Sequence, residues 1–286
     1  MPSNLLLNLN NQAAQPKSSS SSPLRLVTAY SGYPSTYTDY ITTVNNTTTT
    51  NTNNNLKSKI KFGDDAWFIA KQKFIDVLGV ADGVGGWHSI GIDPSKFSSQ
   101  LMRTCKRYVE QELTNQSEHE GERRETPIRI LKQSYEALLE SKQRRSLVGS
   151  STACIILFHH DTSVLHTANL GDSGFAVIRD NHVIHKSQEQ QHYFNSPFQM
   201  GILPPPNPTR NPINVNVNNI NNNNNNSDDD LINDSPDNAS TSSIQLNEGD
   251  FIVVATDGLW DNLSEKQLLV EIANIKVSFL NGKFMC

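Results

Sequence analysis

The 286-residue sequence predicts an α+β fold in which helices cover antiparallel β-sheet. Apolar runs come in pairs around short polar turns, as is typical of β-hairpins. Two amphipathic helical patterns, each preceded by a capping residue and a proline, lie between these hairpins. Strands and helices are therefore grouped and do not alternate strictly, and one predicted layout places the helices outside two sheets.

Two low-complexity tracts limit the part of the chain that can pack. Residues 1–55 are rich in Ser, Thr and Asn, and a segment this polar cannot offset its ordering entropy. The tract from about 204 to 243 contains a run of asparagines and three consecutive aspartates. The sequence therefore predicts a disordered N-terminus, 1–55, and one domain, 56–286, interrupted by a disordered insertion at about 204–243.

The first predicted hairpin joins residues 66–70 to residues 76–81. A turn centred between Lys73 and Phe74 places Asp65 opposite Asp82, because antiparallel register fixes every pair once the turn is set. Two carboxylates far apart in the sequence thus meet at one end of the sheet.

The remaining elements follow from the same signals. Helical patterns begin after Asp93–Pro94 and Thr126–Pro127, and a third begins at Ser264, where a capping box with Gln267 precedes a pattern that decays after Asn274. Asp180–Asn181, residue types that tolerate positive φ, form the turn of one hairpin. The further strands are expected at 151–159, 164–169, 174–179, 182–186 and, buried, at 251–255.

Four acidic sites lie at strand ends beside small residues. Any one of them is most simply a turn. Together they predict a cluster of oxygen ligands for Mg²⁺ or Mn²⁺, since the hairpin register independently brings two of them together. The sites are Asp64–Asp65, Asp82–Gly83, Gly171–Asp172 and Asp257–Gly258.

Five motifs, "FGDDAWF", "LGVADGVGGW", "GSSTA", "ANLGDSG" and "ATDGLWDNL", resemble in order and spacing those of the metal-dependent protein phosphatases of the protein phosphatase 2C (PPM) type. The resemblance covers residues 60–203 and 244–275. It implies a β-sandwich of two antiparallel sheets flanked by helices, with two Mn²⁺ or Mg²⁺ ions at one edge. Val84, where many members have His, and residues 188–195 resemble a smaller branch usually found in mitochondria.

The resemblance implies a role for each acidic motif. Asp82 would bridge both ions, and the Gly83 carbonyl would bind one of them. Asp65 would hold ion-bound water, and Asp257 would bind the first ion. Asp172 matches a position associated with a third, more weakly held ion. The implied catalytic set is Asp65, Asp82 and Asp257.

The sequence departs from the family at three places. Asp64, an implied metal ligand, stands where the family usually has Glu. The family's substrate-phosphate arginine has no evident counterpart, and Lys59 or Lys61 could substitute or could simply be solvated lysines. No acid follows Asn274 to match the family's last metal aspartate, so the fold is expected to be incomplete at its C-terminal end.

The resemblance implies a protein serine/threonine phosphatase, in which water bridging the ions attacks the phosphorus of a phosphoprotein directly. The alternatives are a catalytically inactive or truncated product that acts only by binding, and a chain that does not fold stably. His88 is either a proton donor or a surface histidine. Cys105 and Cys154 lie in apolar patterns, so neither is expected to be a nucleophile.

Composition restricts the other classes of function. The net charge is -5 without a basic stripe, which argues against nucleic-acid binding. No apolar run approaches the ~18 residues of a membrane span. Residues 1–38 contain no acid, which fits a mitochondrial transit peptide loosely, so a mitochondrial location is expected with a cytoplasmic one as the alternative. Nothing in the sequence specifies an oligomeric state.

Overall fold

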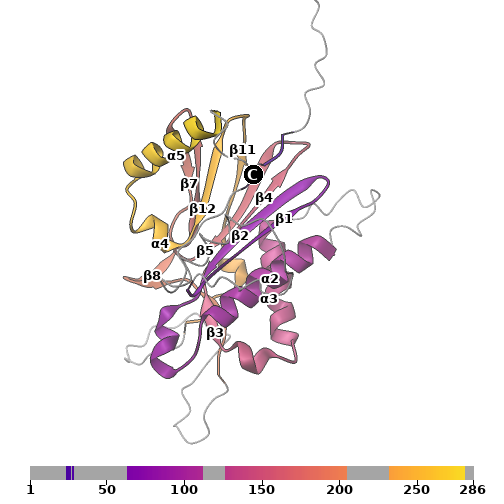
Figure 1. The fold of residues 1–286 in the computed structure, drawn as a ribbon. Coiled ribbons are helices and arrows are strands. Elements are labelled where there is room, and N and C mark those ends of the chain that lie inside the picture. The colour runs from indigo at the N-terminus through magenta and orange to yellow at the C-terminus, as the bar shows by residue number, and fades with distance from the viewer. Residues whose placement is uncertain (1–23, 27, 29–62, 112–125, 205–231, 281–286) are drawn as a thin grey trace, which may run out of the picture.

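The computed structural model describes residues 24–26, 28, 63–111, 126–204 and 232–280 (Figure 1). Most of the predicted disordered N-terminus and residues 205–231 of the predicted insertion lie outside these ranges. Among the described residues, no helix has both the length and the apolar character that a membrane crossing requires.

The larger sheet is antiparallel, with strand order β1-β2-β4-β5-β11. The predicted register of its first hairpin is confirmed, because Asp65 pairs with Asp82. The predicted strand from 151 is divided, since Ser151 belongs to a separate short strand, β3, that pairs with β10. The five strands are β1 (Asp65–Lys71), β2 (Ile75–Asp82), β4 (Ala153–His159), β5 (Val164–Leu170) and β11 (Ser240–Gln245).

A second, three-stranded sheet has the order β12-β6-β7 and packs face to face with the first. Its strands are β6 (Gly174–Arg179), β7 (His182–Lys186) and β12 (Phe251–Ala255). Asp180 and Asn181 have φ values of 48° and 62°, which confirms the predicted turn. An apolar core between the sheets contains Cys154, Ile156, Phe158, Leu165, Phe175, Val177 and Leu246.

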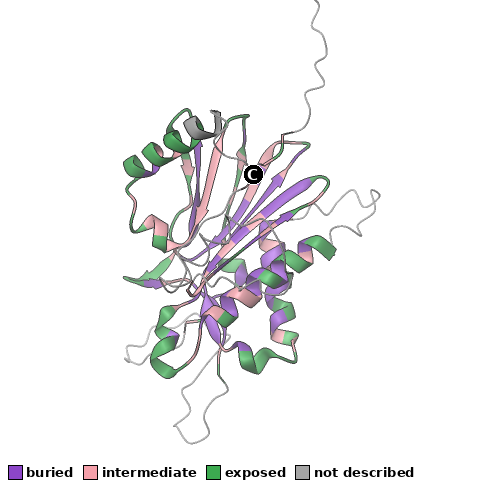
Figure 2. Cartoon of the chain, in the orientation of Figure 1, coloured by how far each residue is buried: buried purple, intermediate pink, exposed green. Residues whose placement is uncertain are grey.

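Helices cover the outer faces of this sandwich (Figures 1 and 2). α2 (Ser95–Gln111) and α3 (Pro127–Glu140) pack on the larger sheet, around a core that includes Phe97, Leu101 and Leu131. The predicted α+β fold, with two antiparallel sheets between helices, is therefore confirmed.

α5 (Glu265–Leu280) lies beside the three-stranded sheet and leaves that sheet partly exposed. The predicted capping box is confirmed: the Ser264 amide donates to Gln267 Oε1, and the Gln267 amide donates to Ser264 Oγ. The helix does not end near Asn274 as predicted, because no Gly or Pro interrupts it before position 282. β12 is half-buried and not fully buried, since Leu268 is the one buried side chain among those described on α5.

The predicted end of the insertion at 243 is wrong. β11 begins at Ser240 and pairs with β5 along its whole length. Its polar side chains are satisfied across the strands, since Thr167 Oγ1 lies 2.7 Å from Ser242 Oγ and accepts from the Ser242 amide at 3.2 Å. The prediction from composition was therefore wrong for β11, an edge strand rich in Ser and Thr.

The prediction of disorder also fails at Leu24 and Leu26, two apolar residues within the polar N-terminal tract. Both pack against the core between the sheets. The Leu26 amide donates to Asp76 Oδ2 at 3.1 Å, and Lys71 Nζ donates to the Leu26 carbonyl at 2.7 Å. This N-terminal segment, Leu24–Leu26, is thus attached at the turn of the β1–β2 hairpin.

The remaining elements are short. They are η1 (Gly85–Ile90), η2 (Arg144–Leu147), β3 (Gly149–Ser151), β8 (Gln191–Tyr193), β9 (Ser196–Pro197), β10 (Met200–Ile202), η3 (Pro236–Asn238) and α4 (Asp257–Trp260). Several of them surround the predicted acidic cluster.

Candidate functional site

The predicted acids gather at one end of the sandwich. Asp65 begins β1 opposite Asp82, which ends β2. Asp257 follows β12 as the first residue of α4, and Thr256 Oγ1 just before it donates to Asp65 Oδ2 at 3.2 Å. Asp172 lies in the turn between β5 and β6. The two sheets therefore contribute acids to one site.

These carboxyl groups repel one another in a partly buried setting. Burial raises the pKa of Asp82 to about 9, with further contributions from the charge of Asp65 and a hydrogen bond with Asp257. Burial also raises the pKa of Asp65 to about 6, opposed by its hydrogen bonds and reinforced by the charges of Asp257 and Asp64. The pKa of Asp172 rises to about 6 through burial and the charge of Asp257. A nearby cation would relieve this repulsion.

The donor set fits a hard divalent cation. Within the described ranges, no three His, Cys, Asp or Glu side chains are already arranged to enclose an ion. Mg²⁺ in particular binds proteins through one or two carboxylates and keeps several waters, so it does not require an enclosed cage. Oxygen donors at strand ends, whose carboxyl groups have raised pKa values without a cation, are therefore suited to Mg²⁺ or Mn²⁺.

Position 83 requires glycine because two backbone carbonyl groups lie close to it. The Gly83 amide donates to the Asp64 carbonyl at 3.1 Å. A Cβ at this position would lie 2.9 Å from the carbonyl oxygens of both Asp64 and Pro94, so only glycine fits without movement of the backbone.

Asp64 and His88 form a pair at the rim of the site. Asp64 Oδ2 lies 2.8 Å from His88 Nε2, and the His88 side chain is 57% exposed. The Asp64 carbonyl also accepts from Ser98 Oγ at 2.6 Å. The side chain of Asp64 is thus engaged with His88, a partner that sequence reasoning did not assign to it.

A supporting layer of hydroxyl and amide groups lies beneath the acids, and sequence reasoning missed it. Trp87, buried in η1, donates from Nε1 to Ser150 Oγ at 2.6 Å. Ser150 Oγ in turn donates to Gln199 Oε1 at 2.5 Å. The motif "GSSTA" was the one available signal for this layer, although it does not reveal the partners.

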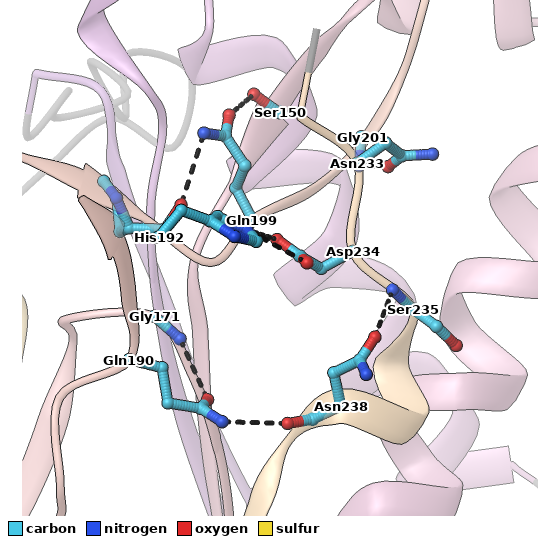
Figure 3. A network of polar contacts seen from close by, with 11 residues as sticks. Ser150, Gly171, Gln190, His192, Gln199, Gly201, Asn233, Asp234, Ser235 and Asn238 are labelled. Carbon is cyan, nitrogen blue, oxygen red and sulfur yellow. Dashed lines mark hydrogen bonds and ion pairs between the residues drawn. The ribbon is translucent and has the colours of Figure 1, made fainter. Parts of the chain in front are cut away.

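This layer continues into residues 233–238, which fall within the predicted insertion at about 204–243 (Figure 3). The Gln199 amide donates to Asp234 Oδ2 at 2.8 Å, and His192 Nε2 lies 2.9 Å from the same oxygen. Gln190 connects the Gly171 amide to the Asn238 carbonyl. The turn that carries Asp172 is therefore connected through Gln190 to Asn238, a residue for which the sequence predicted disorder.

The cysteines are placed as predicted. Cys105 and Cys154 are both fully buried in apolar surroundings. Burial raises the pKa of Cys105 to about 12, and burial raises that of Cys154 as well. Neither thiol lies at the acidic site or is present as a thiolate near neutral pH.

Comparison with known proteins places these features in a family. The family described as protein phosphatase 2C matches residues 57–283. The chain is 45% identical over 221 residues to the protein phosphatase PTC7 homolog of Danio rerio, covering 77% of this chain and 64% of that protein. The PTC7 homolog of Homo sapiens is also 45% identical, over 223 residues, covering 78% of this chain and 64% of that protein. The chain thus spans slightly less than two thirds of these relatives.

A solved structure agrees with this assignment. The X-ray structure of the photosystem II phosphatase PBCP is 27% identical, with a TM-score of 0.54, and the match covers 74% of this chain and 66% of that one. The family match extends over most of the sequence and includes both sheets and all the acids of the site. The chain belongs to the protein phosphatase 2C family.

Proposed function

We propose that this chain is a metal-dependent protein serine/threonine phosphatase that hydrolyses phosphoserine and phosphothreonine in phosphoproteins. The observation that carries the proposal is the pairing of Asp65 with Asp82 across the β1–β2 hairpin, beside Asp257 from the other sheet. Family membership and the PTC7 relatives support this reaction class.

The proposed ligands of two Mn²⁺ or Mg²⁺ ions are Asp65, Asp82, Asp257 and the Gly83 carbonyl, with Asp64 at the rim and Asp172 for a third ion. When bound, such ions supply an acidified water and positive charge for the phosphoryl oxygens. The chain's own part is to hold the acids at the ends of rigid strands, so that little reorganisation is needed. No cysteine nucleophile takes part in this proposal, in keeping with the burial of Cys105 and Cys154.

A mitochondrial location belongs to the same proposal. It is supported by the sequence resemblance to the mitochondrial branch and by the similarity to PTC7 homologs. The acid-free residues 1–38 that would act in targeting lie mostly outside the described ranges.

The test is Mn²⁺-dependent phosphate release from a phosphothreonine peptide by the chain and by two variants. Asp82→Asn should abolish release. Asp237→Asn should retain it, because Asp237 is exposed and pairs with Lys132 on α3, outside the acidic site. If the folded wild-type chain binds Mn²⁺ but releases no phosphate, the phosphatase proposal is overturned and a role in binding alone replaces it.

A further inference from the structure

Thr152 lies directly beneath the acidic cluster and contacts its two sides. It is 1% exposed and occupies the gap between β3 and β4. On one side is Asp82 at the end of β2, and on the other is the turn Gly171–Ser173. No role was assigned to this residue from the sequence.

Thr152 holds the backbone of Asp82 through two hydrogen bonds. The Asp82 amide donates to Thr152 Oγ1 at 3.1 Å, and the Thr152 amide donates to the Asp82 carbonyl at 2.9 Å. The neighbouring contacts extend the same support, since Gly83 bridges to Ser151 and the Val84 amide donates to the Ser150 carbonyl. The backbone that carries the central acid is therefore fixed from below.

The same side chain reaches the turn that carries Asp172. Thr152 Oγ1 lies 2.7 Å from Ser173 Oγ, and Ser173 is also 1% exposed. Gly171 has φ of 99°, and a Cβ there would lie 2.7 Å from Thr152 Cγ2. The hydroxyl of Thr152 therefore joins the two acid-bearing segments, and its methyl group packs against the second of them.

We propose that Thr152 is a positioning residue that fixes the backbone of Asp82 relative to the turn of Asp172 and thereby sets the affinity of the site for divalent cations. This inference rests on the proposed function. The hydroxyl of Thr152 joins the Asp82 backbone to Ser173 beside Asp172, so without it this turn would be free to move and the spacing of the donors would change. Groups that orient metal ligands typically change metal affinity about 10- to 100-fold when they are lost.

The matched pair Thr152→Val and Thr152→Ser separates the hydroxyl from the methyl group. The readout is the half-maximal Mn²⁺ concentration in a calorimetric titration of the folded chain at a fixed temperature, which reports ion binding without any activity. Thr152→Val keeps the side-chain shape but leaves the Asp82 amide without its side-chain acceptor, and it should raise this concentration about 10- to 100-fold. Thr152→Ser keeps the hydroxyl and should stay close to the wild-type concentration, although its ion-free Tm falls with the lost methyl group.

Ser173→Ala provides a test that does not depend on the folding of Thr152→Val. It keeps the acceptor for the Asp82 amide and removes only the connection to the Asp172 turn, so it should also raise the half-maximal Mn²⁺ concentration while circular dichroism stays unchanged. At saturating Mn²⁺, kcat for phosphopeptide should recover in both hydroxyl-deletion variants.

Three results would overturn the inference. A half-maximal Mn²⁺ concentration that is unchanged in Thr152→Val and Ser173→Ala removes the positioning role and leaves the proposed phosphatase intact. A Thr152→Ser variant as impaired as Thr152→Val assigns the effect to packing. A wild-type chain that binds no Mn²⁺ in this titration overturns this inference together with the proposed ion site.

Discussion

Asp82 carries the largest raised pKa among the acids of the site, and this has a defined consequence for stability. A carboxyl group whose pKa is higher in the folded chain than in the unfolded chain binds its proton more tightly when folded. Stability is therefore lost as pH rises above the unfolded value of 3.8, and the loss continues until pH passes the folded value of about 6 for Asp65 and Asp172 or about 9 for Asp82.

The first prediction follows from this loss of stability with rising pH. In EDTA, the Tm of the wild-type chain should fall between pH 5 and pH 8, because the unfolded chain ionises these acids more readily. Asp82→Asn should have a higher Tm than wild type at pH 8 and a flatter pH profile, since an amide does not titrate. A gain of about 1 kcal/mol corresponds to roughly 2 to 4 °C in a domain of this size.

Differential scanning calorimetry at four pH values, with EDTA and with saturating Mn²⁺, measures this effect. Mn²⁺ should stabilise the wild-type chain most at pH 8 and should stabilise Asp82→Asn far less. An ion-free Asp82→Asn with a lower Tm than wild type at pH 8 would show that burial and the acidic neighbours do not destabilise the ionised form of Asp82.

The acids themselves could be predicted from the sequence, but their supports could not. The register of one hairpin was enough to pair Asp65 with Asp82, because a tight turn determines every pair beyond it. Thr152 contacts Asp82 across 70 residues of chain, and this contact depends on how β3 and β4 meet the first hairpin. A threonine in an apolar stretch gives no local signal of such a role.

At the scale of elements, β11 shows where compositional reasoning fails. Its sequence, STSSIQ, has one apolar residue, and Asn, Pro and Asp dominate the tract before it. The strand is stable because Ser and Thr hydroxyls bond across to β5 and because Ile244 packs against the core between the sheets. The predicted hairpins and caps succeeded because turn and cap residues act within a few positions along the chain.

The second prediction tests whether β11 is part of the domain. Ser242→Pro removes the amide that donates to Thr167 Oγ1 and places a proline within a paired strand, so it should destabilise the chain by about 1 to 3 kcal/mol. Asn224→Pro, in the tract predicted from composition to be disordered, is the matched control and should leave the urea midpoint unchanged. Equal midpoints for the two variants would restore the prediction of disorder up to residue 243.

At the scale of the whole molecule, the site depends on the docking of two sheets. Asp65 and Asp82 belong to the larger sheet, whereas Asp257 follows a strand of the smaller one. The core between the sheets therefore keeps the acids together, and the N-terminal segment Leu24–Leu26 contributes to that core. This segment lies at the hairpin turn near Asp76, at the opposite end of β1 and β2 from the acids.

The third prediction separates stability from ion binding at this scale. Replacing Leu24 and Leu26 together by alanine removes two half-buried side chains and should cost about 2 kcal/mol, or roughly 4 to 8 °C in Tm. Arg25→Ala is the matched control, because Arg25 is exposed and its hydrogen bond to the Lys73 carbonyl, at 3.4 Å, is long. The half-maximal Mn²⁺ concentration should stay at the wild-type value in both, since the acids lie at the far end of the hairpin.

A double variant with unchanged Tm would show that the N-terminal segment does not stabilise the sandwich. A double variant with weakened Mn²⁺ binding would show that a change at the hairpin turn alters the packing of the sheets as far as the acids at their other end.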